Sequence, residues 1–285
     1  MKKVLFATTA LVATAGVAQA DITITGGGNA GIRDTGAAGT DPFLHTELDF
    51  NIVGTTTTDN GVTVSASIDL DTDKSGAAGT TTATAVNDPE VSVSGGFGTV
   101  SFGDVSTAND FGLPDIGFDG IGIDDAAEIA LSATADMSYS YSFGDFGVTL
   151  SGDSANDDFA VAFNYAIAGA DITLGYGRDD ATGNETTNLL VKFSVSDVAL
   201  QLYAAQLSVV GGADSDSYGL HAAYAVNDAL TIVAAYGQTE VGAVSTDALG
   251  VGFSYGLGGG VSIAGGVGED ESDNSVMDLG INFSF

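Results

Sequence analysis

The sequence predicts an all-β fold, a 16-stranded antiparallel transmembrane β-barrel. Apolar and polar residues alternate through short segments, as they do in a strand that has lipid on one face and water on the other. The last such segment, 277–285, ends on the aromatic residue Phe285. Short and long connections also alternate along the chain. Composition alone, with 41 Gly and 3 Pro, fits a β protein or a disordered chain, so residue order decides the fold class.

The chain begins with the pattern of a secretory signal peptide. Lys2 and Lys3 precede an apolar stretch at 4–17, and Ala18-Gln19-Ala20 is an A-x-A cleavage site. We therefore expect a signal peptide at 1–20 and one barrel domain at 21–285. No apolar run in that domain approaches the roughly 18 residues of a membrane-spanning helix. A membrane-spanning form would use strands, which places the exported protein in the outer membrane.

Acidic residues dominate the chain, with 38 Asp and Glu against 6 Lys and Arg. Such a charge excludes nucleic acid as a partner and enriches cations near the surface. Solubility or adaptation to a salty medium would explain the same composition. The absence of Cys excludes disulfides, thiol catalysis and Cys-ligated metal sites.

Seven hairpins are expected, each with an apolar residue at every second position on both sides of a turn. Their paired segments are 48–52 with 62–68, 91–93 with 100–102, 139–143 with 148–150, 159–165 with 172–176, 189–195 with 198–202, 218–224 with 230–236, and 249–255 with 261–267. Segments 22–24 and 279–285 bring the number of strands to sixteen. Pairing of the last strand with the first would leave no unpaired strand edge, whose backbone N–H and C=O groups could find no hydrogen-bond partner in lipid.

The connections predict one end with short turns and one with longer loops, as in barrels with a periplasmic and an external end. The longer loops are expected at 34–44, 72–87, 105–135, 179–185, 208–215, 239–245 and 269–274, with a brief one at 154–156. Aromatic residues recur beside the short turns, as an interfacial girdle requires: Phe97, Phe143, Phe146, Tyr165, Phe193, Tyr224 and Tyr255. An alternative explanation is a soluble protein, because half-buried strands in its sheet would show the same alternation of apolar and polar residues.

Two stretches carry a family resemblance, Ser94–Asp104 and the glycine-rich Leu249–Gly266 followed by Met277–Phe285. With them the chain resembles the general-diffusion porins of alphaproteobacteria, the Rhodobacter type. The resemblance implies a homotrimer in the Gram-negative outer membrane, surrounded by membrane lipid and lipopolysaccharide. It also implies a third external loop folded into the lumen and passive diffusion of ions and small hydrophilic solutes. Gly26, Gly28 and Ala30 have outward parity and would offer a flat surface to a neighbouring barrel.

Sixteen strands enclose a lumen too wide for side chains to fill, so a loop must narrow it. The longest connection, 105–135, is the candidate, and by resemblance it is the constriction loop. It offers apolar anchors at Phe111, Phe118, Ile121 and Ile123. Its acidic residues are candidates for the constriction: Asp110, Asp115, Asp119, Asp124, Asp125 and Glu128. Asp125 and Glu128 have the spacing of a capping box, which predicts a short helix.

Strand parity assigns the lumen side of the wall. Glu47, Asp49 and Asp69 point inward where their neighbours face lipid, and so do the basic residues Arg33 and Lys192. Further inward positions are Asn164, Gln201, His221, Asp278 and Asn282, whereas Arg178 has outward parity. In related porins, basic residues of the wall lie across the lumen from the acidic loop. Here few basic residues have inward parity. We expect a cation-preferring channel, unless the carboxylates are solvated charges without effect on permeation.

Other candidate chemistry is limited. Asp69-Leu-Asp-Thr-Asp73 opens like a calcium loop, but Lys74 and Thr80 occupy its glycine and glutamate positions, so it is not an EF-hand. Asp69, Asp71 and Asp73 remain a calcium candidate, as does the acidic run 269–273, and no other cofactor is expected. The two histidines, His45 and His221, lack the serine and acid spacing of a hydrolase, so we predict no enzyme activity.

The leading hypothesis is an outer-membrane diffusion channel. The main alternative is a secreted, acidic, calcium-binding β-sheet protein of the cell surface, with a role in adhesion. A third alternative, an outer-membrane enzyme or a specific uptake channel, lacks a recognisable catalytic set or plug. Extraction separates the first two, because a channel needs detergent whereas a surface protein washes off with chelator.

Overall fold

The computed structural model of the chain describes residues 20–75, 80–81, 85–129 and 135–285. The signal peptide predicted for 1–20 lies outside these residues, except for Ala20. Among the described residues, no helix is long and apolar enough to cross a membrane.

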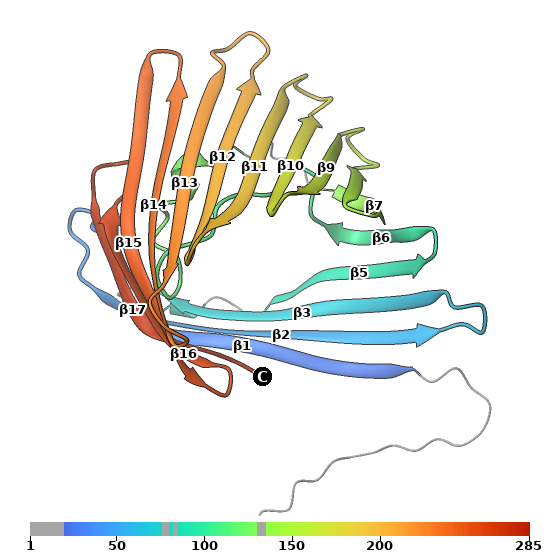
Figure 1. Ribbon diagram of the computed structural model, residues 1–285, viewed down its shortest axis with the longest axis horizontal. Coiled ribbons are helices and arrows are strands. Elements are labelled where there is room, and N and C mark those ends of the chain that lie inside the picture. Colours follow the sequence, from blue (N-terminus) through green and yellow to red (C-terminus); the bar gives the residue numbers. More distant parts are fainter. Residues whose placement is uncertain (1–19, 76–79, 82–84, 130–134) are drawn as a thin grey trace, which may run out of the picture.

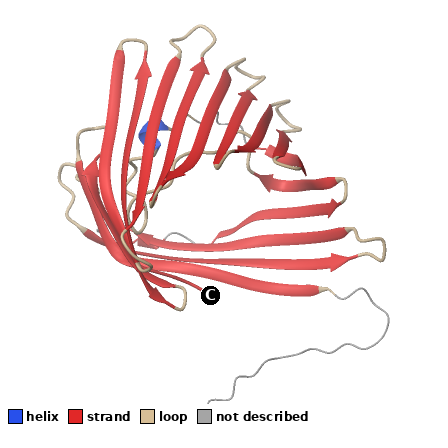
Figure 2. Ribbon diagram, viewed as in Figure 1, coloured by secondary structure: helices blue, strands red, loops and turns tan. Residues whose placement is uncertain are grey.

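The described wall is a closed antiparallel barrel of sixteen strands (Figures 1 and 2). Its strands are β1 Asp21–Asp34, β2 Phe43–Thr57, β3 Thr63–Ser75, β5 Ala85–Gly95, β6 Gly98–Val105, β7 Ala135–Phe143, β8 Phe146–Gly152, β9 Phe159–Ile167, β10 Ala170–Arg178, β11 Glu185–Val195, β12 Val198–Ser208, β13 Ser215–Ala225, β14 Leu230–Val241, β15 Val244–Gly258, β16 Val261–Glu269 and β17 Ser275–Ser284. A two-residue strand, β4 (Thr80–Thr81), pairs with the end of β3. The predicted number of wall strands is confirmed.

The barrel closes where its first and last strands meet. β17 pairs with β1 over eight residues, from Gly27 opposite Ser284 to Asp34 opposite Met277. Beyond that ladder, the backbone N–H of Phe285 donates to the carbonyl of Gly26 at 2.9 Å, and Gly26 donates back at 3.1 Å. The final residue is therefore hydrogen-bonded into the wall, as the terminal strand predicts.

The outer face of the wall is apolar and the inner face is polar. In β17, the side chains of Met277, Leu279 and Ile281 are exposed, while Asp278 between them is buried on the inside. Large apolar side chains are exposed in this way around the whole barrel. Contact between water and an apolar surface of this size is unfavourable, so the surface indicates contact with the lipid of a membrane.

Two local expectations differ from the structure. The connection predicted at 239–245 is only Gly242 and Ala243, because polar residues continue the ladder, with Thr239 opposite Thr246. Backbone pairing does not need apolar side chains, so strands extend past the apolar belt. Of the three small residues predicted to form a flat outer surface, Gly26, Gly28 and Ala30, the two glycines are covered by aromatic rings. A Cβ atom added at Gly26 would lie 3.1 Å from Phe285, and one at Gly28 would lie 3.0 Å from Phe283.

The hydrophobic core lies inside the barrel, between the wall and the segment that joins β6 to β7 (Figure 1). This constriction loop, residues 106–134, is described up to residue 129. One cluster combines Ile116, Ile121, Ile123 and Ala126 of the loop with Ala235, Ala248 and Val276 of the wall. A second combines Leu113 and Ala127 with Leu190, Tyr203 and Ala205. The predicted folding of the loop into the lumen is confirmed.

Candidate functional site

Inward-facing glycines of the wall make room for the constriction loop. Ile116 is 1% exposed and lies against β15 and β16, where a Cβ atom added at Gly252 would be 2.4 Å from its Cγ2. Ile123 is fully buried, and a Cβ atom at Gly268 would lie 2.9 Å from it. Glycine lets the loop approach the wall at distances that any other residue would prevent. The predicted anchors Phe118, Ile121 and Ile123 are all buried, and Phe111 packs beside the second cluster.

Polar contacts fix the first part of the loop to the wall. The amide of Asn109 donates to Thr186 Oγ1 at 2.9 Å, and Asn188 donates to the Asn109 carbonyl at 2.6 Å. The backbone N–H of Ala108 donates to Ser151 Oγ at 2.8 Å. These bonds reach across 43 to 79 residues of sequence and hold the outgoing limb of the loop, residues 106–118, on β8 and β11.

The tip of the loop is held at the seam of β1, β2 and β17. The carboxylate of Asp119 forms an ion pair with Arg33, and its Oδ1 lies 3.0 Å from Nε2 of His45. Nη2 of Arg33 also donates to the Gly120 carbonyl at 2.7 Å. Asp278 of β17 accepts the backbone N–H groups of Phe118 and Asp119 at 2.9 and 3.2 Å. Side chains from all three strands therefore converge on one turn.

The return limb, residues 120–129, contains a single 3₁₀ turn, η1 (Asp125–Ala127), drawn as the blue helix in Figure 2. The predicted short helix is present, but the predicted capping box is not. Asp124 occupies the N-cap without a side-chain bond. Glu128 instead accepts the backbone N–H of Leu113 on the outgoing limb at 2.9 Å. Glu128 thus joins the two limbs of the loop rather than capping its own helix.

The acidic residues of the loop divide by exposure. Asp110, Asp115, Asp125 and Glu128 are exposed, Asp119 is half-buried at the tip, and Asp124 is buried. Burial, with repulsion from Asp115, raises the pKa of Asp124 to about 7. Four of the six predicted constriction residues therefore present carboxylates to water.

The lumen side of β2 and β3 is also acidic. Glu47 and Asp49 of β2 and Asp69 of β3 stand in neighbouring rows, and Asp69 accepts a hydrogen bond from Asn51 at 3.0 Å. Asp49, Asp69 and Asp71 each offer an oxygen within 4.8 Å of the others. The structure thus brings together two of the three predicted calcium ligands with Asp49, while the side chain of Asp73 lies outside the described residues. Calcium binding at this cluster stays a prediction.

Few positive charges balance this wall. Arg33 faces the lumen as expected but is engaged by Asp119. Lys192 is exposed on β11, where Asp171 and Gln201 are its cross-strand neighbours. Arg178 has the predicted outward parity, with Nη1 3.4 Å from Glu185 at the end of β10.

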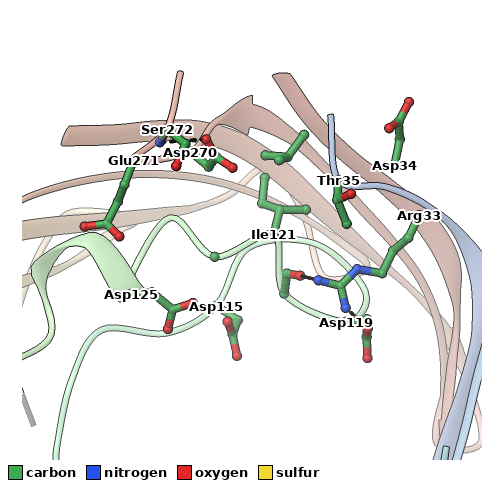
Figure 3. A pocket seen from close by; sticks show the side chains of 13 residues that line it. Arg33, Asp34, Thr35, Asp115, Asp119, Ile121, Asp125, Asp270, Glu271 and Ser272 are labelled. Carbon is green, nitrogen blue, oxygen red and sulfur yellow. Dashed lines mark hydrogen bonds and ion pairs between the residues drawn. The ribbon is translucent and has the colours of Figure 1, made fainter. Parts of the chain in front are cut away.

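A polar pocket of about 370 Å³ opens between the loop and the wall (Figure 3). Figure 3 shows Asp270 and Glu271, from the connection between β16 and β17, on one side, and Asp115, Asp119 and Asp125 on the other. Arg33 reaches the tip of the loop beside them. The pocket is therefore rimmed mainly by carboxylates, which makes it a place where cations concentrate.

Several residues of the site escaped sequence analysis. Leu113 and Ile116 are buried anchors that parity could not reveal, and His45 contacts the loop tip. One sequence signal could have revealed where the loop anchors pack. Inward positions of the wall carry glycines two residues apart, such as Gly250 with Gly252 and Gly266 with Gly268. His221 is buried opposite Gln201 and Ala235, neither of which is a serine or an acid.

The family is decided by comparison with known proteins. A family model described as Gram-negative porin matches residues 7–275, nearly the whole chain. The chain belongs to the Gram-negative porin family. A curated porin from Fuscovulum blasticum is 30% identical over 221 residues, which is 74% of this porin and 72% of that one.

Solved porin structures share the fold. A porin refined at 1.8 Å resolution matches with a TM-score of 0.77 and 21% identity, covering 93% of this porin and all of the other chain. A mutant of Rh. blastica porin matches with a TM-score of 0.75, 24% identity and the same coverage. This porin is therefore an outer-membrane channel for the passive diffusion of ions and small hydrophilic solutes.

Proposed function

We propose that this porin prefers cations over anions. The observation that supports the proposal is the charge on both sides of the channel. The loop carries exposed carboxylates, among them Asp115 and Asp125, and the wall of β2 and β3 carries Glu47, Asp49 and Asp69. Arg33, the basic residue nearest the loop tip, is neutralised by Asp119. Carboxylates on both sides raise the local concentration of cations and lower that of anions.

The test is the zero-current potential of single channels in a KCl gradient, recorded in EDTA. The wild-type potential should have the sign of potassium preference. Asp49→Asn with Asp69→Asn should move it toward zero, because two wall charges are lost. Asp228→Asn, which removes a carboxylate from an exposed turn between β13 and β14, is the matched control and should leave the potential unchanged. A wild-type potential of the opposite sign, showing chloride preferred, would contradict the proposal.

We also propose that the porin assembles as a homotrimer without catalytic activity. The family resemblance supports the trimer, and the apolar outer wall supplies surface that adjacent barrels can share. The surroundings of His221 support the absence of catalysis, since its cross-strand neighbours are Gln201 and Ala235. Light scattering of the detergent-solubilised protein tests the assembly, and a protein mass of one barrel would contradict it.

A further inference from the structure

A groove opens on the outer face of the wall, across β14 to β17 and β1. It has a volume of about 600 Å³ and is lined chiefly by apolar side chains and glycines. Its shape follows from one row of cross-strand neighbours, which are Ile232, Phe253, Gly265, Leu279 and Ile32 on these five strands. The middle position of the row has no side chain, so the exposed residues beside Gly265 form the sides of a groove.

The groove continues toward the end of the barrel that carries the longer loops. A second hollow of about 530 Å³ shares Val251, Val267 and Met277 with the first and reaches Asp34 and Glu269. Together the two hollows form the outer groove, which follows β16 from residue 265 to residue 269, about 13 Å of extended strand. An apolar floor therefore leads to a rim with two carboxylates.

The outer groove lies on the membrane-facing wall, so its candidate occupants are an acyl chain and a neighbouring barrel. A neighbouring copy would cover Asp34 and Glu269 together with the apolar residues, and buried carboxylates need a positive partner. The chain has six basic residues, two of them in the predicted signal peptide. Arg33 is engaged at the tip of the constriction loop, and Arg178 is paired with Glu185. An acyl chain instead leaves its headgroup at the water-facing rim, which favours lipid.

The charge at the rim selects among headgroups. Glu269 is exposed, Asp270 and Glu271 follow it in the chain, and Asp34 uses Oδ1 to accept the backbone N–H of Gly36 at 2.9 Å. Neither hollow is lined by a basic residue among those that the structure describes. Such a rim repels a headgroup with net negative charge, whereas an ammonium group offers N–H donors to the carboxylates.

We propose that the outer groove binds one acyl chain of an amine-bearing phospholipid, of the phosphatidylethanolamine type, with its ammonium group at Asp34 and Glu269. The groove contacts the chain from its floor and both sides, which gives more dispersion contacts than the open wall does. The lipid would lie behind Gly252 and Gly266, on whose inner side Ile116 of the constriction loop packs. The proposal rests on the apolar outer wall and not on the ion preference of the channel.

Fluorescence quenching by brominated lipids tests the site, because the chain contains no Trp and a single introduced Trp reports only the lipid beside it. Leu249→Trp places this reporter at the rim of the outer groove, where the side chain is 51% exposed. Leu202→Trp, on the outward face of β12 and 43% exposed, is the matched control. In EDTA, brominated phosphatidylethanolamine should compete with phosphatidylglycerol about fivefold better at Leu249→Trp than at Leu202→Trp, the factor for one charge contact at a membrane surface.

Further changes on the Leu249→Trp background separate the chain from the headgroup. Val267→Phe fills the outer groove with a ring and should remove the preference for phosphatidylethanolamine. Val191→Phe, on the outward face of β11, is its control and should keep that preference. Glu269→Gln with Asp34→Asn should bring the two lipids closer to equal quenching, because the rim then loses its charge.

Equal competition by the two lipids at both reporters would overturn the proposal. So would weak quenching by either lipid at Leu249→Trp in the assembled oligomer, because a neighbouring barrel would then fill the groove. Lipopolysaccharide that displaces the brominated lipid better than unbrominated phosphatidylethanolamine does would overturn it as well. The two reporters decide the question even if a groove-filling variant fails to assemble.

Discussion

Asp119 shows how one side chain fixes the end of a long loop. It is 10% exposed as a side chain and contacts Arg33, His45 and Asn29, which come from β1 and β2. An exposed ion pair contributes about 0–1 kcal/mol, but a buried carboxylate that loses its partners costs several times more. The partners of Asp119 therefore hold the tip in place, and Asp119 in turn neutralises the positive charge of Arg33.

Arg33→Gln should make the channel more cation-preferring. Asp119 would keep His45 and Asn29 as partners, but its carboxylate would lose the positive charge that neutralises it. A unit charge several ångströms from the ion path shifts its potential by on the order of RT, so the potassium-to-chloride permeability ratio should rise about twofold. Arg178→Gln, at an outward position, is the control and should change nothing in the same bilayer recording.

Asp124 should make the stability of the loop depend on pH. Burial raises its pKa to about 7 from the ordinary value of 3.8, so the folded state favours the protonated form. Its contribution to the free energy of unfolding is complete below pH 3.8 and is lost as the pH rises through 7. In EDTA, the thermal midpoint should therefore fall between pH 5 and 8. Asp124→Asn should flatten that slope and Asp110→Asn should keep it, whereas an unchanged slope in Asp124→Asn would refute this assignment.

The constriction loop and its glycine-lined wall form one packing unit. Ile116, Ile121 and Ile123 pack where β14 to β16 carry glycine or alanine on the inner face. Dense packing of this kind transmits a small change in the wall to the loop. The width of the path through the barrel is therefore set partly by residues that solutes never touch.

Gly252→Ala should displace the loop. The new methyl group would lie 2.4 Å from Cγ2 of Ile116, and overpacking of a tight contact costs about 1–3 kcal/mol. Single-channel recordings should show a changed conductance with more current fluctuation. Gly147→Ala is the matched control, since its nearest neighbour would be 3.5 Å away. Identical traces for the two variants would show that the loop does not rest on Gly252.

Sequence analysis predicted the strands better than their ends or the loop contacts. Alternation revealed the hairpins because lipid and water impose opposite demands on the two faces of each strand. Beyond the apolar belt the strands stay paired, as Thr239 does with Thr246, but their sequence shows no alternation of apolar and polar residues. Anchors such as Phe118 stood out because large apolar residues are unusual in a polar loop. The partners of Asp119 stayed hidden, because Arg33 is 86 residues away and parity gives no depth in the barrel.

At the scale of the whole molecule, the barrel separates three environments. Its outer wall is apolar, its core lies between the loop and the wall, and exposed carboxylates stand on both the loop and the inner face of β2 and β3. Closure through Gly26 and Phe285 leaves no free edge along the seam of β1 and β17. The central claim is that the acidic face of the constriction loop lies in the path of the ions.

The most direct test of that claim is one single-channel experiment on Asp125→Cys in EDTA. The chain contains no cysteine, so a cationic methanethiosulfonate reagent would modify this position alone. Placing a positive charge there should lower both the conductance and the potassium preference within one recording. Asp228→Cys, on an exposed turn, should not respond. An unchanged current after complete modification of Asp125→Cys would place the loop outside the ion path and contradict the account.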